Sequence, residues 1–311
     1  MTQTDKMLSR KEGGVGYLIF NNPERHNAVS LEMWNAASGI LADFASDNAI
    51  RVVVLTGAGG KAFVSGADIS KFESERSSKD AIDRYNDAVD KANTAVYEFP
   101  KPTIAMIRGY CIGGGVGLAL CCDLRICSDS SKFGVPAAKL GLGYGFKGIK
   151  KLVDVVGPSF AKEIFFTARQ FTAAEALLMS LVNRVLPDAE VEKYVKDYAE
   201  TISGNAPLTV NSVKYIVGEV VKDESKRNLK RCDDLVAQCF ASKDYVEGRK
   251  AFMLFTSETK VLSVLIYDLN ESGDLAAIAV LGLLMLVITF VVVALANSLR
   301  GGNARRNVAV G

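Results

Sequence analysis

The chain has 311 residues, 49% of them hydrophobic and 23% charged, which is enough to bury a full core in one large domain or two. Its 37 basic and 35 acidic side chains nearly cancel without an evident basic run, so the charge pattern of a nucleic-acid-binding protein is missing. The single histidine, His26, excludes a histidine-based zinc site and is expected in an exposed loop. The six cysteines form no C-x-x-C pair and are expected to be reduced, mostly in the core.

Short β-rich segments alternate with helical patterns from the N-terminus onward. VGYLIF (15–20) predicts a strand, 31–46 a helix capped by Ser30, and RVVVLTG (51–57) a second strand. PTIAMIRG (102–109) predicts a third strand, which leads into three glycines and a helix across 116–122. LRICSD, SKFGV and VNRVLP predict further strands, and from about Thr172 to Phe252 the pattern is helical. This alternation predicts an α/β fold.

The glycine triplet 113–115 allows two interpretations. A dinucleotide-binding G-x-G-x-x-G needs a small residue where Leu118 or Leu120 stands, and a P-loop needs a Lys-Ser/Thr pair that does not follow. One remaining interpretation is close packing of a helix against a sheet. The other is a strand-to-helix junction whose bare backbone N–H groups face a ligand oxygen.

Three stretches carry a resemblance: NNPERHNAVS, GGKAFVSGADISKF, and the long segment from KPTIAMIRG through the triplet to FGVPAAKLGL. Together they resemble the crotonase (enoyl-CoA hydratase/isomerase) superfamily over about residues 14–253. The resemblance implies a spiral of ββα turns over 1–195 and a helical trimerisation region over 196–253. It also implies acyl-CoA thioester substrates, no permanently bound cofactor besides the coenzyme A of the substrate, and a homotrimer or hexamer.

The resemblance also implies a site. A thioester enolate would be held by two backbone N–H groups, those of Ala67 and Gly114. Coenzyme A would lie along a loop region near Phe63, where Asp68 is expected to hold the loop rather than to react. The residues implied in coenzyme A binding are Arg25, Ala28, Phe63, Asp68 and Ile69.

Departures from the family pattern put the reaction in question. The positions of the family's proton-transferring carboxylates correspond to Gly117, Ala137 and Gly145, which cannot move protons. A water, Lys139 or an acid within 73–90 could replace them.

Decarboxylation of a malonyl-type thioester needs oxyanion donors but no base to start it. The segment after LGL is similar to methylmalonyl-CoA decarboxylases, whose corresponding tyrosine matches Tyr144; those enzymes can carry a histidine where Ala67 stands. Tyr144 can equally be a packing residue. Nearby, Lys147, Lys150 and Lys151 are expected on a solvated face.

The C-terminal tail, 254–311, has a different character. Residues 275–296 are uncharged and would form a helix of about 33 Å, enough to span a bilayer core, although a buried helix would also fit. Arginines follow this segment, so the positive-inside rule places the C-terminus in the cytoplasm. That orientation would put the coenzyme A domain outside, although no export signal is apparent in the polar N-terminus, so the two halves conflict.

The tail resembles the last spanning segment of an ABC transporter permease. This predicts a fusion or deletion joint near residues 253–254, with a genuine membrane anchor as the alternative. The sequence as a whole predicts a cytoplasmic enzyme of the enoyl-CoA hydratase/isomerase type, attached to a membrane if the tail is a genuine anchor. The alternatives are a methylmalonyl-CoA-type decarboxylase and a coenzyme A ester-binding domain without turnover.

Overall fold

The computed structural model describes residues 4–71 and 78–255, and the chain divides into two compact units, Met1–Cys239 and Phe240–Gly311. The described part of the second unit is mainly helix α11 (Lys243–Phe255). None of the described helices is long and apolar enough to cross a membrane. The predicted membrane-spanning segment, 275–296, lies outside the described residues.

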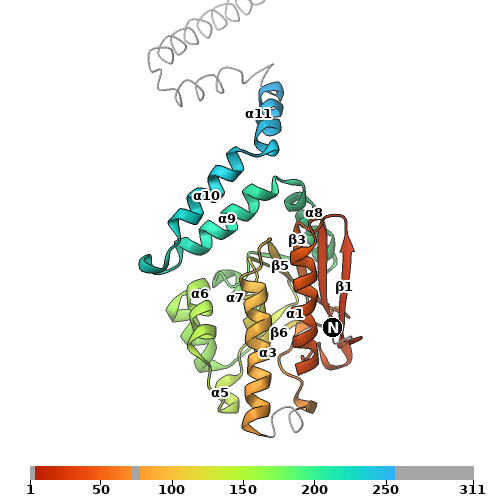
Figure 1. Cartoon of the computed structure of the whole chain (residues 1–311). Coiled ribbons are helices and arrows are strands. Elements are labelled where there is room, and N and C mark those ends of the chain that lie inside the picture. The colour runs from red at the N-terminus through yellow and green to blue at the C-terminus, as the bar shows by residue number, and fades with distance from the viewer. Residues whose placement is uncertain (1–3, 72–77, 256–311) are drawn as a thin grey trace, which may run out of the picture. The chain divides into compact units, whose positions relative to one another are not determined.

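The first unit contains two β-sheets (Figure 1). The larger sheet has the order β1-β2-β3-β5-β7-β10, with only the edge strand β1 antiparallel to its neighbour. Its strands are Met7–Glu12, Val15–Phe20, Val52–Gly57, Thr103–Ile107, Leu124–Ser128 and Arg184–Leu186. The smaller sheet has the order β4-β6-β8-β9, with β9 antiparallel to β8. Its strands are Ala62–Val64, Tyr110–Ile112, Lys132–Gly134 and Phe171–Thr172.

The chain winds through these sheets in repeated ββα turns. Each turn gives one strand to the larger sheet, the next to the smaller sheet, and then a helix: β3-β4-α3, β5-β6-α4, and β7-β8 followed by α5 and α6. The predicted ββα spiral is therefore confirmed. The helices up to this point are α1 (Leu31–Ser46), α3 (Lys79–Tyr97), α4 (Gly114–Ala119), α5 (Ala137–Leu140) and α6 (Phe146–Thr167).

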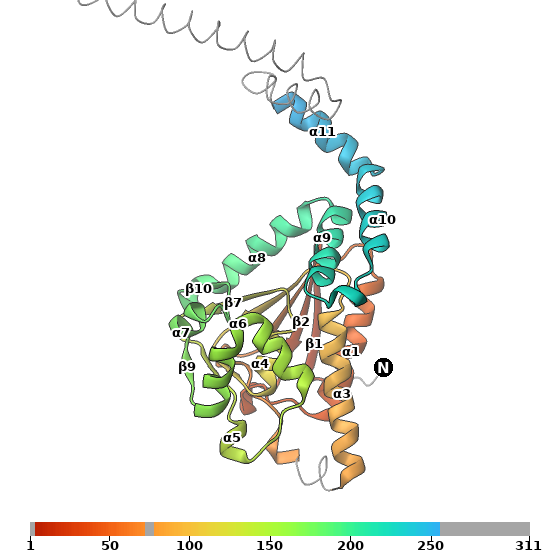
Figure 2. The same ribbon diagram turned by 90° about the vertical axis from the view of Figure 1, so that its left-hand side faces the viewer.

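Side chains on the two faces of the larger sheet enter different clusters because strand residues alternate in direction. In β2, Leu18 and Phe20 join the main core, together with Trp34 of α1. Val15 and Tyr17 of the same strand pack on the opposite face, against Val191, Val195 and Ala199 of α8 (Asp188–Gly204). Helices α1 and α3 run side by side over the main core (Figure 2). The larger sheet is thus covered on both faces.

The C-terminal part of the first unit is helical, as predicted. After α7 (Ala173–Leu178) and α8 come α9 (Pro207–Val220) and α10 (Leu229–Phe240). Three short 3-10 helices, Pro23–Arg25, Ile69–Lys71 and Glu224–Lys226, complete the described elements.

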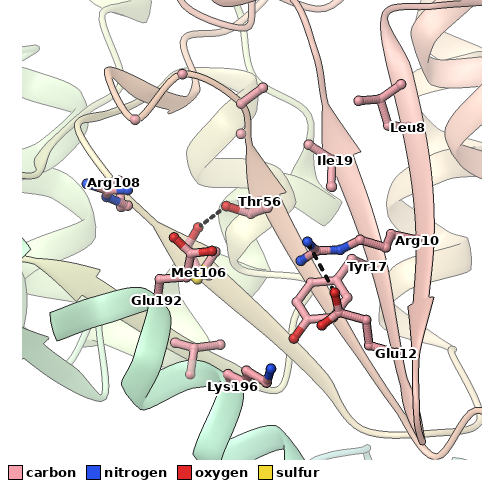
Figure 3. A pocket seen from close by; sticks show the side chains of 15 residues that line it. Leu8, Arg10, Glu12, Tyr17, Ile19, Thr56, Met106, Arg108, Glu192 and Lys196 are labelled. Carbon is pink, nitrogen blue, oxygen red and sulfur yellow. Dashed lines mark hydrogen bonds and ion pairs between the residues drawn. The ribbon is translucent and has the colours of Figure 1, made fainter. Parts of the chain in front are cut away.

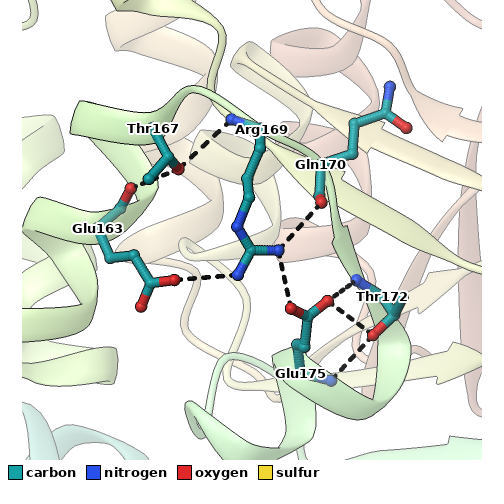
Figure 4. Close-up of polar contacts among 6 residues, drawn as sticks. All are labelled: Glu163, Thr167, Arg169, Gln170, Thr172 and Glu175. Atoms are coloured by element: carbon teal, nitrogen blue, oxygen red, sulfur yellow. Dashed lines mark hydrogen bonds and ion pairs between the residues drawn. The ribbon is translucent and has the colours of Figure 1, made fainter.

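A polar cluster fixes the turn between α6 and α7 (Figure 4). Arg169 donates to Glu163 at 3.0 Å and to Glu175 at 2.8 Å, while Glu175 and Thr172 form a reciprocal capping box at the start of α7. The backbone N–H of Thr172, followed by the Arg169 guanidinium, lowers the pKa of Glu175 from 4.5 to about 2. This cluster holds β9 beside β8, whose Gly134 takes part in the candidate site.

Candidate functional site

Two loops from different ββα turns meet at Gly66 and Gly114. A Cβ built on Gly66 would lie 3.4 Å from the Ile112 carbonyl oxygen and 3.9 Å from the Gly114 nitrogen. A Cβ on Gly114 would in turn lie 3.9 Å from Gly66 Cα. Gly66 has a φ of 105°, a conformation that favours glycine. The loop after β4 and the loop after β6 are therefore in contact through bare backbone.

The N–H of Ala67 follows Gly66 in the chain and so lies beside this junction. The Val29 N–H donates to the Gly66 carbonyl at 2.8 Å, and the Asp68 N–H donates to the Val29 carbonyl at 3.1 Å. The C=O and N–H of a trans peptide point in opposite directions, so the Ala67 N–H is directed away from Val29. Among the described residues, no acceptor takes a hydrogen bond from it. An N–H group held in this way is available to a ligand.

The N–H of Gly114 is exposed by a similar arrangement. The Gly113 N–H donates to the Gly134 carbonyl at 2.8 Å, and the Gly113 carbonyl accepts from the Gly117 N–H at 3.2 Å as the first bond of α4. The Gly114 N–H, on the same peptide as that carbonyl, therefore points out of the N-terminal end of α4. It also has no acceptor within the part of the chain that the structure describes.

The third glycine of the triplet has a packing role. A Cβ on Gly115 would lie 2.0 Å from the Val64 carbonyl oxygen, a clash that neither backbone can relieve without moving. The two interpretations of the glycine triplet thus apply to different residues. Gly115 allows α4 to approach β4, while Gly114 presents an open N–H.

The loop before α1 is held by a buried asparagine. The side-chain amide of Asn27 donates to the carbonyls of Ala58 and Ala62 at 2.9 and 2.7 Å, and its Oδ1 accepts from the Asn22 N–H at 2.8 Å. Asn27 has a φ of 55°, which asparagine tolerates better than most residues. It thereby fixes the loop that carries Arg25, Ala28 and Val29.

The residues expected to bind coenzyme A differ in exposure. Arg25 is exposed, with Nη1 3.8 Å from Asp68 Oδ1. Asp68 is 3% exposed, and its Oδ1 accepts from the N–H and hydroxyl of Ser70 at 3.1 and 2.6 Å, which suits a role in holding the loop. Ala28 is 8% exposed, and the Phe63 side chain is fully buried against Phe20, so these two offer a ligand mainly backbone groups.

Ile69 begins the 3-10 helix Ile69–Lys71, next to Asp68. Its backbone is therefore on the same loop as Ala67. Its participation in coenzyme A binding stays a prediction.

Tyr144 lies two residues before α6 and packs on Phe165, with the ring centroids 5.0 Å apart and the rings at 69°. This contact supports the packing interpretation, and a catalytic role stays a prediction. His26 is exposed as expected, with its ring edge against Tyr110. All six cysteines are free, and the four in apolar runs are buried, as expected.

Gly117 opens onto a cavity of about 70 Å³ between three helices. Its lining includes Asp90 and Asn93 from α3, Gly117 and Cys121 from α4, and Lys147 and Lys151 from α6. A Cβ on Gly117 would meet nothing within 4 Å. Gly117 thus lines the cavity with its backbone, and a side chain at this position would have open space around its Cβ.

The expectation that Lys151 belongs to a solvated face is wrong. Lys150 is exposed and pairs with Asp154 at 2.6 Å, whereas Lys151 is partly buried. Lys151 Nζ donates to Cys121 Sγ at 3.2 Å and lies 4.3 Å from the centroid of the Tyr97 ring. Neighbouring residues of α6 face different surroundings because successive helical positions are about 100° apart.

A larger hollow, of about 420 Å³, lies between α8 and the face of the larger sheet that packs on it (Figure 3). None of the residues predicted for the site lines it. Its two arginines are already paired, Arg10 with Glu12 at 3.3 Å and Arg108 with Asp188. This hollow is therefore not the site that the two open N–H groups define.

The comparison with known proteins gives the family. The enoyl-CoA hydratase/isomerase family model matches residues 10–255. The short-chain-enoyl-CoA hydratase of Clostridium acetobutylicum is 31% identical over 81% of this chain and 95% of that protein. The crotonyl-CoA hydratase of Syntrophomonas wolfei is 32% identical over 80% of this chain and 95% of that protein. A crystal structure of an enoyl-CoA hydratase/carnithine racemase from Magnetospirillum magneticum has a TM-score of 0.75 and 34% identity, covering 81% of this chain and 94% of that one.

The fold and the sequence similarity thus define an α/β protein with the crotonase architecture. The chain belongs to the enoyl-CoA hydratase/isomerase family, whose enzymes act on coenzyme A thioesters.

Proposed function

We propose that this protein binds an acyl-CoA thioester and stabilises its enolate with the N–H groups of Ala67 and Gly114. The observation that carries the proposal is the contact between the Gly66 and Gly114 backbones. At this contact the N–H groups of Ala67 and Gly114 are both directed away from neighbouring acceptors. A preorganised donor of this kind is worth about 3 to 4 kcal/mol in the transition state. Both donors are held by main-chain hydrogen bonds, so no reorganisation is needed when charge develops on the oxygen.

Coenzyme A would lie along the loops that carry Arg25, Ala28, Asp68 and Ile69, with the Phe63 backbone nearby. The exposed guanidinium of Arg25 supplies positive charge for a phosphate group, and Asp68 keeps the loop in shape through Ser70. No further cofactor is required. The expected assembly is a homotrimer or a hexamer.

A second candidate reaction is decarboxylation of a malonyl-type thioester. Gly117, Ala137 and Gly145 offer no group that transfers protons, and the expulsion of CO₂ needs none at the start. In that step the bond between Cα and the carboxylate breaks, its electron pair forms the enolate, and a solvent proton then adds to Cα. Tyr144 would help to orient the acyl group.

The test is incubation of the full chain with crotonyl-CoA and with methylmalonyl-CoA, followed by mass analysis of the products. Addition of water to crotonyl-CoA supports the hydratase reaction, and release of propionyl-CoA supports the decarboxylase. Tight binding without turnover supports a coenzyme A ester-binding domain. Absence of binding to any acyl-CoA overturns the proposal.

Membrane attachment through 275–296 is a separate proposal, supported by the uncharged run in the sequence. It predicts that the full chain partitions into a detergent phase. Recovery of the full chain in detergent-free buffer would contradict it.

A further inference from the structure

The cavity beside Gly117 contains a cation without a carboxylate partner. Lys151 lines it, and its Nζ contacts the sulfur of Cys121, another lining residue, and the Tyr97 ring. No carboxylate among the described residues lies within ion-pair distance of Lys151. Burial raises the pKa of the Cys121 thiol, which therefore stays neutral and does not compensate the lysine charge. A partly buried ammonium without a carboxylate within ion-pair distance favours an anionic ligand.

Asn93 adds a polar side chain to the lining of the same cavity. The Asn93 side-chain Oδ1 is buried and accepts no hydrogen bond from the described residues. The two ends of an asparagine amide have the same shape, so rotation of the side chain places donor N–H groups at this position. Lys147 adds another cation to the lining, and the exposed carboxylate of Asp90 offsets only one of the two lysine charges. The lining therefore keeps a net positive charge.

The cavity lies within reach of the proposed enolate site. Gly114 and Gly117 are three residues apart on α4, so they share a helix face and are separated by about 4.5 Å along the axis. The Cys121 thiol donates to the Gly117 carbonyl at 3.2 Å and accepts from Lys151 at the same distance, which links the lysine to this face. A substituent near the thioester carbon can therefore approach Lys151.

The size of the cavity suits a small polar group. A water molecule needs roughly 10 to 15 Å³ of such space, so about 70 Å³ accommodates a carboxylate with an attached methylene. The absence of a side chain at Gly117 leaves this space open. A carboxylate at position 117 would both fill the cavity and pair with Lys151.

We propose that this cavity binds a carboxylate carried by the acyl group, so that the preferred substrates are coenzyme A thioesters of short dicarboxylic acids. Lys151 pairs with that carboxylate, and the Asn93 amide donates to it. The inference rests on the proposed function, because it places the thioester oxygen at Gly114. It does not depend on which reaction follows enolate formation.

The experiment compares the affinities of the full chain for succinyl-CoA and butyryl-CoA, which have the same four-carbon acyl chain and differ in the terminal carboxylate. Calorimetry is carried out on the wild type, on Lys151→Met and on the control Lys150→Met, which removes an exposed lysine on a different side of α6. Lys151→Met should weaken succinyl-CoA binding about tenfold or more and leave butyryl-CoA within twofold. Lys150→Met should change neither.

A second variant guards against a folding defect in the first. Gly117→Glu places a carboxylate where a Cβ meets no atom within 4 Å, so the fold should be kept. It should abolish the preference for succinyl-CoA while butyryl-CoA still binds. Retention of that preference in both variants would overturn the inference.

Free coenzyme A serves as a further control, because its phosphates are the other source of negative charge that Lys151 could bind. If Lys151→Met weakens binding of free coenzyme A as much as that of succinyl-CoA, the lysine recognises a phosphate and the inference is wrong. Equal affinity of the wild type for both thioesters would also overturn it, and the proposed function would stand. If neither thioester binds, the proposed function itself fails.

Discussion

The N–H of Gly114 can be removed without removing the helix that carries it. Gly114 is the first residue of α4, a position where proline is well accepted because the N–H has no intrahelical partner. Gly114→Pro should therefore keep the fold and lower kcat by about 10² to 10³, the effect of losing one oxyanion donor, or roughly 2.7 to 4 kcal/mol. The assay is the turnover of crotonyl-CoA or methylmalonyl-CoA, whichever the wild type supports.

The matched control is Gly114→Ala, which keeps the N–H. Its Cβ would lie 3.9 Å from Gly66 Cα, an ordinary contact, so we expect activity within about threefold of the wild type. Binding of butyryl-CoA to both variants separates donor loss from obstruction by the proline ring, because donor loss acts mainly on kcat. A folded Gly114→Pro protein that keeps a third of the wild-type kcat would refute the donor role of this N–H, as would an equal loss of activity in both variants.

Three further predictions concern stability. Gly115→Ala should destabilise the protein by about 1 to 3 kcal/mol or more, because its Cβ would lie 2.0 Å from a carbonyl oxygen. Gly117→Ala should be neutral or stabilise the protein by up to about 1 kcal/mol. Equal urea midpoints for the two variants would contradict this difference. Asn27→Asp should lower the melting temperature, because it replaces the amide that donates at 2.9 and 2.7 Å with an acceptor facing two carbonyls. An unchanged melting temperature would show that Asn27 does not hold the loop before α1. Glu175 has its pKa lowered from 4.5 to about 2, so its stabilising contribution is complete above about pH 4.5 and is lost as the pH falls toward 2. Glu175→Gln should show a smaller loss of stability over that range, measured by urea unfolding at each pH.

Local patterns in the sequence were sufficient to predict many of the strands and helices. The strand 15–20 and the helix 31–46 were predicted with the observed bounds, and Ser30 caps that helix by accepting from the Met33 N–H at 3.4 Å. The helix after the glycine triplet begins at Gly114 rather than 116, because three of the first four residues of α4 are glycines and show no apolar periodicity. The helix buries apolar residues at helical spacing, and five of the six strand residues are buried, so the apolar patterns of both segments match the observed burial.

Other elements were not predicted because their signals are weak. The edge strand β1 (Met7–Glu12) buries only its first residue, so it lacks the alternation that marks a half-buried strand. Helix α3 buries mainly small residues, with Ala81, Ala88 and Ala92 at helical spacing, and its many charged residues obscure this pattern. The direction of Lys151 could not be read from three lysines within five positions, because the lysines themselves do not show which side of the helix faces the interior.

The candidate site separates two proposed tasks: holding the thioester oxygen, and acting on the acyl group beside it. This separation explains how a chain can keep the first task and change the second. The N–H groups of Ala67 and Gly114 are directed by main-chain bonds, from Val29 to Gly66 and from Gly113 to Gly134, that no side chain supplies. A substitution at position 117 changes the side of α4 that faces α3 and α6 but leaves those bonds intact. The sequence motifs report the first task because they are made of glycines with fixed backbone geometry. The second task, which we propose is carboxylate binding in place of proton transfer, depends on which side chains line the cavity.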